Sequence, residues 1–177
     1  MIKARIFSFE DIPSRVEWLN DPKINKTMFF DLPATIEKTE AWFKNKDKTT
    51  RIDFSFVEKD ILVGMGGFIN IDKINANAEF YIMISPLLQG KGYGKLLSLW
   101  MYNFAFIELN LHKIYLYTND DNIAAYKIYE YAGFTLEGIL REQKYKSGVF
   151  ISRRFYGLLR QEWQTKEWKK EIIKYEF

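Results

Sequence analysis

The segment that most constrains this chain is a glycine-rich stretch between an apolar run and a long amphipathic pattern, SPLLQGKGYGKLLSLWMYNFAF, residues 85–106. A strand that turns into a helix through glycines exposes unpaired backbone N–H groups at the positive end of the helix dipole, and such a site favours phosphate. Glycine also lets the backbone approach an anion without a Cβ in the way. The segment therefore predicts a strand, an anion-binding turn and a helix, in that order; the alternative is a plain turn that only starts the helix.

Two common phosphate-binding loops do not match this turn. A P-loop requires a glycine where Gln89 stands and Ser or Thr where Leu96 stands. A dinucleotide-binding G-x-G-x-x-G pattern that starts at Gly90 requires a glycine at Lys95, and no acidic residue ends the following strand at the expected place. Neither loop fits the sequence.

The rest of the chain alternates between strand and helix patterns. Helices are predicted at 10–21, 36–46, 92–108 and 122–134, and strands at 3–7, 51–59, 61–71, 77–85, 112–118, 135–145 and 149–159. Pro22 is expected to end the first helix, Thr35 to cap the second and Gly133 to end the last. The turn at Lys59 and Asp60 predicts an antiparallel hairpin. In the helix at 92–108 the apolar residues follow the spacing of one buried face, and they are Leu96, Leu97, Trp100, Met101 and Phe104.

Length and composition favour one globular domain over residues 1–177. The chain has no cysteine, which excludes disulfides, thiolate metal sites and a cysteine nucleophile. It has no apolar run long enough for a membrane span, so we expect a cytoplasmic protein without a membrane partner. The net charge of +3 is spread along the chain, and the basic end KEWKKEIIK reads as a solvated helix face rather than a nucleic-acid patch. A metal site is not expected.

Two motifs carry a family resemblance. Gln89, Gly92 and Gly94 form a Gln-x-x-Gly-x-Gly pattern, and the segment TNDDNIAAYKIYEYAGF at 118–134 carries Asn-x-x-Ala followed by Tyr-x-x-x-Gly-Phe. Together they resemble the GNAT superfamily of N-acetyltransferases, and the order of elements is similar over nearly the whole chain. The resemblance implies an α/β (α+β) domain with a central, mixed, mostly antiparallel seven-stranded sheet flanked by helices, in which strands 4 and 5 splay apart. It also implies acetyl-CoA as the acetyl donor.

The same resemblance implies which residues bind acetyl-CoA. The backbone of Met83 and Ile84 would pair with the pantetheine arm. Asn122 would bond to that arm, with helix capping as the alternative reading, and Ala125 and Asn119 are further candidates. The pyrophosphate would be held by the turn, whose residues are Gln89, Gly90, Lys91, Gly92, Tyr93, Gly94 and Lys95.

Tyr129 is the candidate general acid. Attack of a neutral amine on the thioester forms a tetrahedral adduct, and its collapse expels a thiolate that benefits from a proton donor; a phenol with a reference pKa of about 10 can supply the proton. A core ring is the alternative reading of Tyr129. Glu79 is the candidate base for the amine, with a surface carboxylate as its alternative. His112, the only histidine, falls at the opposite end of the predicted site and is read as structural.

The acceptor pocket is expected to have an aromatic wall formed by Phe29, Phe30 and Tyr81. The acceptor is expected to be a small-molecule amine or a peptide, and peptide N-termini, polyamines and aminosugar nucleotides stay open. The leading hypothesis is an acetyl-CoA-dependent N-acetyltransferase that works by direct attack. A non-catalytic CoA-binding module of the same fold is the alternative, a homodimer is left open and no nucleic acid is expected as a partner.

Overall fold

The computed structural model describes residues 2–28, 32–167 and 174–175. Its strands are β1 (Ile2–Ile6), β2 (Ile52–Glu58), β3 (Ile61–Asp72), β4 (Asn77–Ile84), β5 (Lys113–Asn119), β6 (Thr135–Lys146), β7 (Val149–Leu159) and β8 (Lys174–Tyr175). Its helices are η1 (Phe9–Asp11), α1 (Ile12–Asn20), α2 (Pro22–Asn25), α3 (Ile36–Asn45), α4 (Tyr93–Ile107), α5 (Ile123–Ala132) and α6 (Arg160–Gln164).

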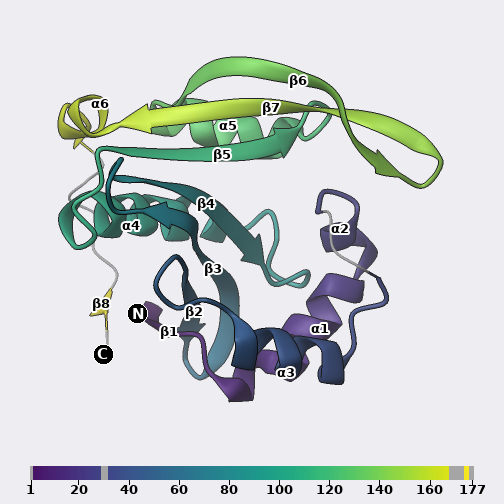
Figure 1. The fold of residues 1–177 in the computed structure, drawn as a ribbon. Helices are drawn as coiled ribbons and strands as arrows, with labels where there is room; N and C mark the ends of the chain where they lie inside the picture. Colours follow the sequence, from purple (N-terminus) through teal and green to yellow (C-terminus); the bar gives the residue numbers. More distant parts are fainter. Residues whose placement is uncertain (1, 29–31, 168–173, 176–177) are drawn as a thin grey trace.

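The strands form one mixed sheet in the order β6-β7-β5-β4-β3-β2-β1-β8 (Figure 1). The seven long strands confirm the predicted sheet, and the two-residue β8 adds a short parallel pairing beside β1. All other neighbours are antiparallel except β4 and β5. The sheet is therefore mostly antiparallel with one parallel pair near its middle.

Each face of the sheet packs on a different set of helices. Ala78 and Phe80 of β4 lie in the core cluster that contains most of α4, whereas Met83 of the same strand lies in the cluster with α1 and α2. This follows from the alternation of side chains along a strand. In consequence α4 and α5 cover one face, and α1 to α3 cover the other (Figure 1).

The buried surface of α4 is broader than the sequence indicates. Its central part is buried almost all round, while Leu96, expected on the core face, is only half-buried. Phe54 of β2 packs edge-on against Trp100 at 5.3 Å, and Trp163 of α6 stacks on Phe106 at 5.1 Å. The helix is thus enclosed by the sheet and by the chain that follows β7, and a single-face pattern cannot reveal that second layer.

The local signals in the sequence correspond to the observed turns and caps. The side chain of Thr35 accepts a hydrogen bond from the Lys38 N–H at 3.2 Å, and Gly133 ends α5 with φ of 93°. Lys59 and Asp60 have φ of 49° and 63°, as the hairpin turn requires. Pro22, however, lies just after the end of α1 and also begins the short helix α2, capped by Asp21. Proline is tolerated at a first helical position, so it both separates and starts a helix here.

No helix within the described ranges is both long and apolar enough to cross a bilayer.

Candidate active site

The candidate site lies where β4 and β5 separate. Their parallel pairing covers only Asn77 to Glu79 of β4 and Lys113 to Tyr115 of β5, although both strands continue beyond it. Met83 and Ile84 therefore lie on the part of β4 that pairs with β3 on one side only. This geometry confirms the expected splay of the fourth and fifth strands, and it leaves room beside β4 for an extended ligand.

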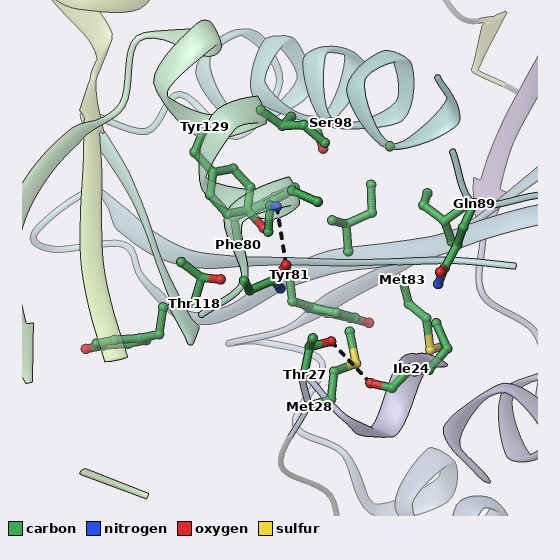
Figure 2. A pocket seen from close by; sticks show the side chains of 18 of the residues that line it. Ile24, Thr27, Met28, Phe80, Tyr81, Met83, Gln89, Ser98, Thr118 and Tyr129 are labelled. Atoms are coloured by element: carbon green, nitrogen blue, oxygen red, sulfur yellow. Dashed lines mark hydrogen bonds between the residues drawn. The ribbon is translucent and has the colours of Figure 1, made fainter. Parts of the chain in front are cut away.

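A cavity of about 770 Å³ fills this split and continues to the face covered by α1 and α2. Such a volume is ordinary for a site that holds a small molecule or cofactor. Figure 2 shows Tyr129 entering the cavity from α5, opposite Ile24, Thr27 and Met28 of the α2 region. The hairpin of β6 and β7 reaches the same region, because Lys146 Nζ donates a hydrogen bond to the Met28 carbonyl at 2.7 Å.

The glycine-rich turn has the backbone geometry that anion binding requires. Gly90 and Gly92 have φ of 76° and 88°, a region that side chains other than glycine rarely adopt, and Gly92 is the N-cap residue of α4. At both positions the space where a Cβ would stand has no atom within 4 Å. This open cradle at a helix N-terminus fits the pyrophosphate of acetyl-CoA.

Five of the seven predicted residues of the glycine-rich turn line the cavity. They are Gln89, Gly90, Gly92, Gly94 and Lys95. Of the other two predicted residues, Lys91 has an exposed side chain, and the Tyr93 hydroxyl donates a hydrogen bond to Glu58 Oε2 at 2.6 Å. These two residues are therefore outside the lining. Binding of the pyrophosphate by their backbone N–H groups, and the added charge expected from Lys91, stay predictions.

Tyr129 has a ring in the core and a hydroxyl at the cavity. The ring packs near Phe80, Phe134 and Tyr156, with centroids 6.4, 5.9 and 6.3 Å away. Burial raises the pKa of Tyr129 to about 12, so the phenol keeps its proton at neutral pH. The reading as a core ring therefore holds for the aromatic part of the side chain, while the general-acid role of the hydroxyl stays a prediction.

The asparagines predicted beside Tyr129 differ in position. The Asn122 side chain lines the cavity and accepts a hydrogen bond from the Ala125 N–H at 3.3 Å, so it caps α5 as its alternative reading proposed. Ala125 also lines the cavity. Asn119 is only 3% exposed and is not among the described lining residues. A bond from Asn122 or Asn119 to pantetheine stays a prediction.

Glu79 lies at the last paired position before the strands separate, and it lines the cavity. Its Oε2 accepts a hydrogen bond from Asn70 Nδ2 at 3.1 Å. Burial raises the pKa of Glu79, and this effect exceeds the opposing effects of Arg153, Lys144 and Arg51. A carboxylate with a raised pKa is a stronger base than a surface carboxylate, which suits the proposed role.

Tyr81 is the one residue of the predicted acceptor wall that lies within the described part of the chain. Tyr81 lines the cavity, and its hydroxyl donates a short hydrogen bond to Asp53. Phe29 and Phe30 lie outside the described residues. His112 is exposed at the end of the sheet where β5 begins and does not line the cavity.

Sequence reasoning missed a group of charged residues around Tyr81. Asp53 is 2% exposed and accepts hydrogen bonds from Lys46 Nζ at 2.6 Å and Arg51 Nε at 2.8 Å. Burial acts to raise the pKa of Asp53, but Arg51, Lys46 and the Tyr81 hydroxyl outweigh it and hold that pKa below its usual value. Asp53, which stands between the apolar residues Ile52 and Phe54 of the predicted strand, was the available signal.

The chain matches the family model described as an acetyltransferase (GNAT) domain over residues 4–135. It is 38% identical over 136 residues to the spermidine N(1)-acetyltransferase of Vibrio cholerae, a match that covers 75% of this chain and 78% of that protein. It is 25% identical over 151 residues to the putative ribosomal N-acetyltransferase YdaF of Bacillus subtilis, covering 82% of each chain. The crystal structure of the Vibrio cholerae spermidine N-acetyltransferase with CoA and spermine superposes with a TM-score of 0.87 at 27% identity, covering 93% of this chain and 98% of that one.

Proposed function

The chain belongs to the acetyltransferase (GNAT) domain family, whose members acetylate amines with acetyl-CoA, and from this premise we propose a direct transfer in which Tyr129 is the general acid and Glu79 the base. Acetyl-CoA supplies the activated acetyl thioester. The glycine turn and the open end of β4 are proposed to hold its pyrophosphate and pantetheine, and the amine is proposed to enter from the α1 and α2 face.

One observation carries this proposal. The hydroxyl-bearing Tyr129, the left-handed glycines Gly90 and Gly92 and the carboxylate of Glu79 line a single cavity, although they come from three different parts of the chain. An acid, an anion cradle and a base in one cavity are what amine acetylation by direct attack requires.

Each residue has a defined step in this proposal. Glu79 accepts a proton from the ammonium form of the acceptor, either directly or through a water, which leaves the nitrogen lone pair available. The nitrogen bonds to the acetyl carbon, and the bond from that carbon to sulfur breaks. Tyr129 donates its phenolic proton to the departing thiolate. The second proton that the nitrogen loses as it becomes an amide passes through water to the phenolate, and Glu79 releases its own proton to solvent. No covalent bond to the protein forms.

A simple assay tests the proposed function. Purified protein is incubated with acetyl-CoA and a panel of polyamines, aminosugars, aminosugar nucleotides and peptides, and released thiol is followed against a reaction without amine. Because the chain has no cysteine, it adds no thiol background. Amine-dependent thiol release is expected. Binding of CoA without any amine-dependent release would favour the non-catalytic module instead.

The expected cytoplasmic location, the single domain over residues 1–177 and the lack of a nucleic-acid or membrane partner stay predictions, and a homodimer stays open. One structural relative is described as a dodecamer, the spermidine N-acetyltransferase of Vibrio cholerae. We therefore propose that this chain also assembles, and sedimentation of the purified protein will test the number of subunits.

A further inference from the structure

The acceptor side of the cavity has an excess of positive charge. Six cationic side chains line the whole cavity, and Glu79 is the single carboxylate among the described lining residues. The six are Arg15, Lys23, Arg51, Lys95, Lys144 and Arg153. This balance is opposite to what a polyamine site requires, because a polyamine carries several positive charges at neutral pH.

The positive charges divide between the two ends of β4. Lys95 belongs to the first turn of α4, and Lys23 Nζ lies 3.4 Å from the Pro86 carbonyl beside the glycine turn. The other four act at the opposite end. Arg51, Lys144 and Arg153 influence the ionisation of Glu79, and Arg15 and Arg51 that of Tyr81.

This second group is too far from the glycine turn to serve the pyrophosphate. Glu79 and Ile84 are five residues apart along β4, which corresponds to about 17 Å in an extended strand. Glu79 and Tyr81 also lie on the face that packs toward α1, as the burial of the alternate residue Phe80 against α4 indicates. The four residues Arg15, Arg51, Lys144 and Arg153, which we call the basic cluster, therefore belong to the acceptor side.

Two members of the basic cluster, Arg15 and Arg51, lie close together around Trp42 with Lys46, whereas Arg153 lies over the Tyr117 ring at 4.7 Å. Arg15 Cζ lies 4.4 Å from the centroid of a Trp42 ring, and Lys46 Nζ and Arg51 Cζ each lie 4.9 Å away. Asp53 is the buried carboxylate that Lys46 and Arg51 share. Concentrating cations in a partly desolvated place disfavours folding, so a cluster of this kind beside a reaction site indicates a charged ligand.

We propose that the acceptor is a phosphorylated primary amine, such as an aminosugar phosphate or a nucleotide-linked aminosugar, and that the basic cluster binds its phosphate. This inference rests on the proposed function. A phosphate monoester carries nearly two negative charges at neutral pH, which matches the surplus better than the single charge of a carboxylate. A guanidinium group such as that of Arg153 presents paired donors to phosphate oxygens.

Matched pairs of acceptors test the inference. Glucosamine is compared with glucosamine 6-phosphate, and ethanolamine with phosphoethanolamine, with spermidine as the cationic member. In at least one pair, we expect kcat/KM for the phosphorylated amine to exceed that for its unphosphorylated parent by at least about tenfold, which is the usual effect of one charged contact. The same phosphorylated amine should also exceed spermidine by at least about tenfold. In Lys144→Glu and in Arg153→Gln the ratio of the phosphorylated amine to its parent should fall toward one, while the KM for acetyl-CoA stays within about twofold.

Arg141→Glu is the control, because Arg141 lies on the same strand as Lys144 with an exposed side chain and is not part of this cavity. The ratio should be unchanged in this variant. A preference for spermidine, for an unphosphorylated amine or for peptides would overturn the inference and leave the proposed function standing. If no amine in the wider panel is acetylated, the proposed function fails, and this inference fails with it.

Discussion

The two ends of the cavity differ in which part of the chain is suited to bind a ligand. At the end of β4 that leads into α4, the groups are mostly backbone, and glycines with positive φ open the space for an anion. At the Glu79 end, the groups are side chains from α1, β4, β6, β7 and the residue before β2, and most are charged. A backbone site suits a ligand that never changes, whereas a side-chain site can be altered residue by residue, as a variable acceptor requires.

Tyr129 lies at the junction of these two ends, and its removal should have the largest effect. In Tyr129→Phe the ring contacts with Phe80 and Phe134 are retained, so folding and acetyl-CoA binding should persist. We expect kcat to fall by roughly 10² to 10⁴, the usual contribution of a general acid. Steady-state kinetics will measure this, and near-wild-type turnover would return Tyr129 to the role of a packed ring.

The pH profile sharpens the same prediction. The phenol is active in its protonated form, and its pKa is raised to about 12 by burial. The wild-type kcat should therefore show no fall from phenol ionisation near pH 10, where an unperturbed tyrosine would lose its proton. A fall at that pH that disappears in Tyr129→Phe would show that the phenol titrates normally when the substrates are bound.

Asp53 forms ion pairs with Lys46 and Arg51 beside the Glu79 end of the cavity. Asp53→Asn should destabilise the fold by about 3 to 5 kcal/mol, because it leaves these two cations without their shared carboxylate in a buried place. The pKa of Asp53 is lowered in the folded state, so its contribution is present above the ordinary Asp pKa of about 4 and is lost as the pH falls through the lower folded value. Chemical denaturation across pH will measure both effects.

Asp60→Asn is the matched control for Asp53→Asn. Asp60 lies in an exposed hairpin turn with φ of 63°, which asparagine also tolerates. It should change the stability by no more than about 0.5 kcal/mol. Equal losses in the two variants would contradict the special position of Asp53.

A substitution at Gly92 tests whether the glycine-rich turn binds CoA. In wild type, CoA at a hundredfold excess over its Kd should stabilise the protein by about 2.7 kcal/mol, and Gly92→Val should remove most of this gain, since the branched side chain enters the open cradle at a positive φ. Gly138→Val is the control, because Gly138 also has open space at the Cβ position but lies in strand β6. Thermal shifts with and without CoA will compare them. A full CoA shift in Gly92→Val would place the cofactor elsewhere.

Replacing Asn122 should give the smallest effect, and it distinguishes a role in helix capping from a bond to pantetheine. Loss of the cap in Asn122→Ala should cost about 1 kcal/mol of stability in the absence of ligand. If the side chain also bonds to pantetheine, the KM for acetyl-CoA should rise by up to about tenfold. A lower melting temperature with an unchanged KM would leave only the cap.

The sequence predicted the cavity end at the glycine-rich turn better than it predicted the Glu79 end. Gln89 to Lys95 form one continuous motif, and the preference of left-handed positions for glycine is a local property that a sequence displays directly. Arg15 and Arg153 lie more than a hundred positions apart, and they line the same cavity only because of the strand order and the docking of α1. Their grouping depends on tertiary packing, which composition and periodicity do not reveal.

The fold shows the same division. Caps and turns at Thr35, Lys59 and Gly133 follow from single residues and their neighbours, and the structure confirms them. The all-round burial of α4 depends on Trp163, which follows β7 and stacks on a helix more than fifty residues earlier. A hydrophobic pattern reports how much of a helix is apolar but not which later segment will cover it.

Both ends of one cavity must be occupied at once if transfer is direct, and initial-rate kinetics test this claim most directly. Rates are measured over a grid of acetyl-CoA and acceptor concentrations, using the best amine from the panel. We predict double-reciprocal lines that intersect, because both substrates bind before CoA leaves. Parallel lines, together with a radiolabelled acetyl group that stays on the protein when amine is absent, would indicate a covalent intermediate and contradict direct attack.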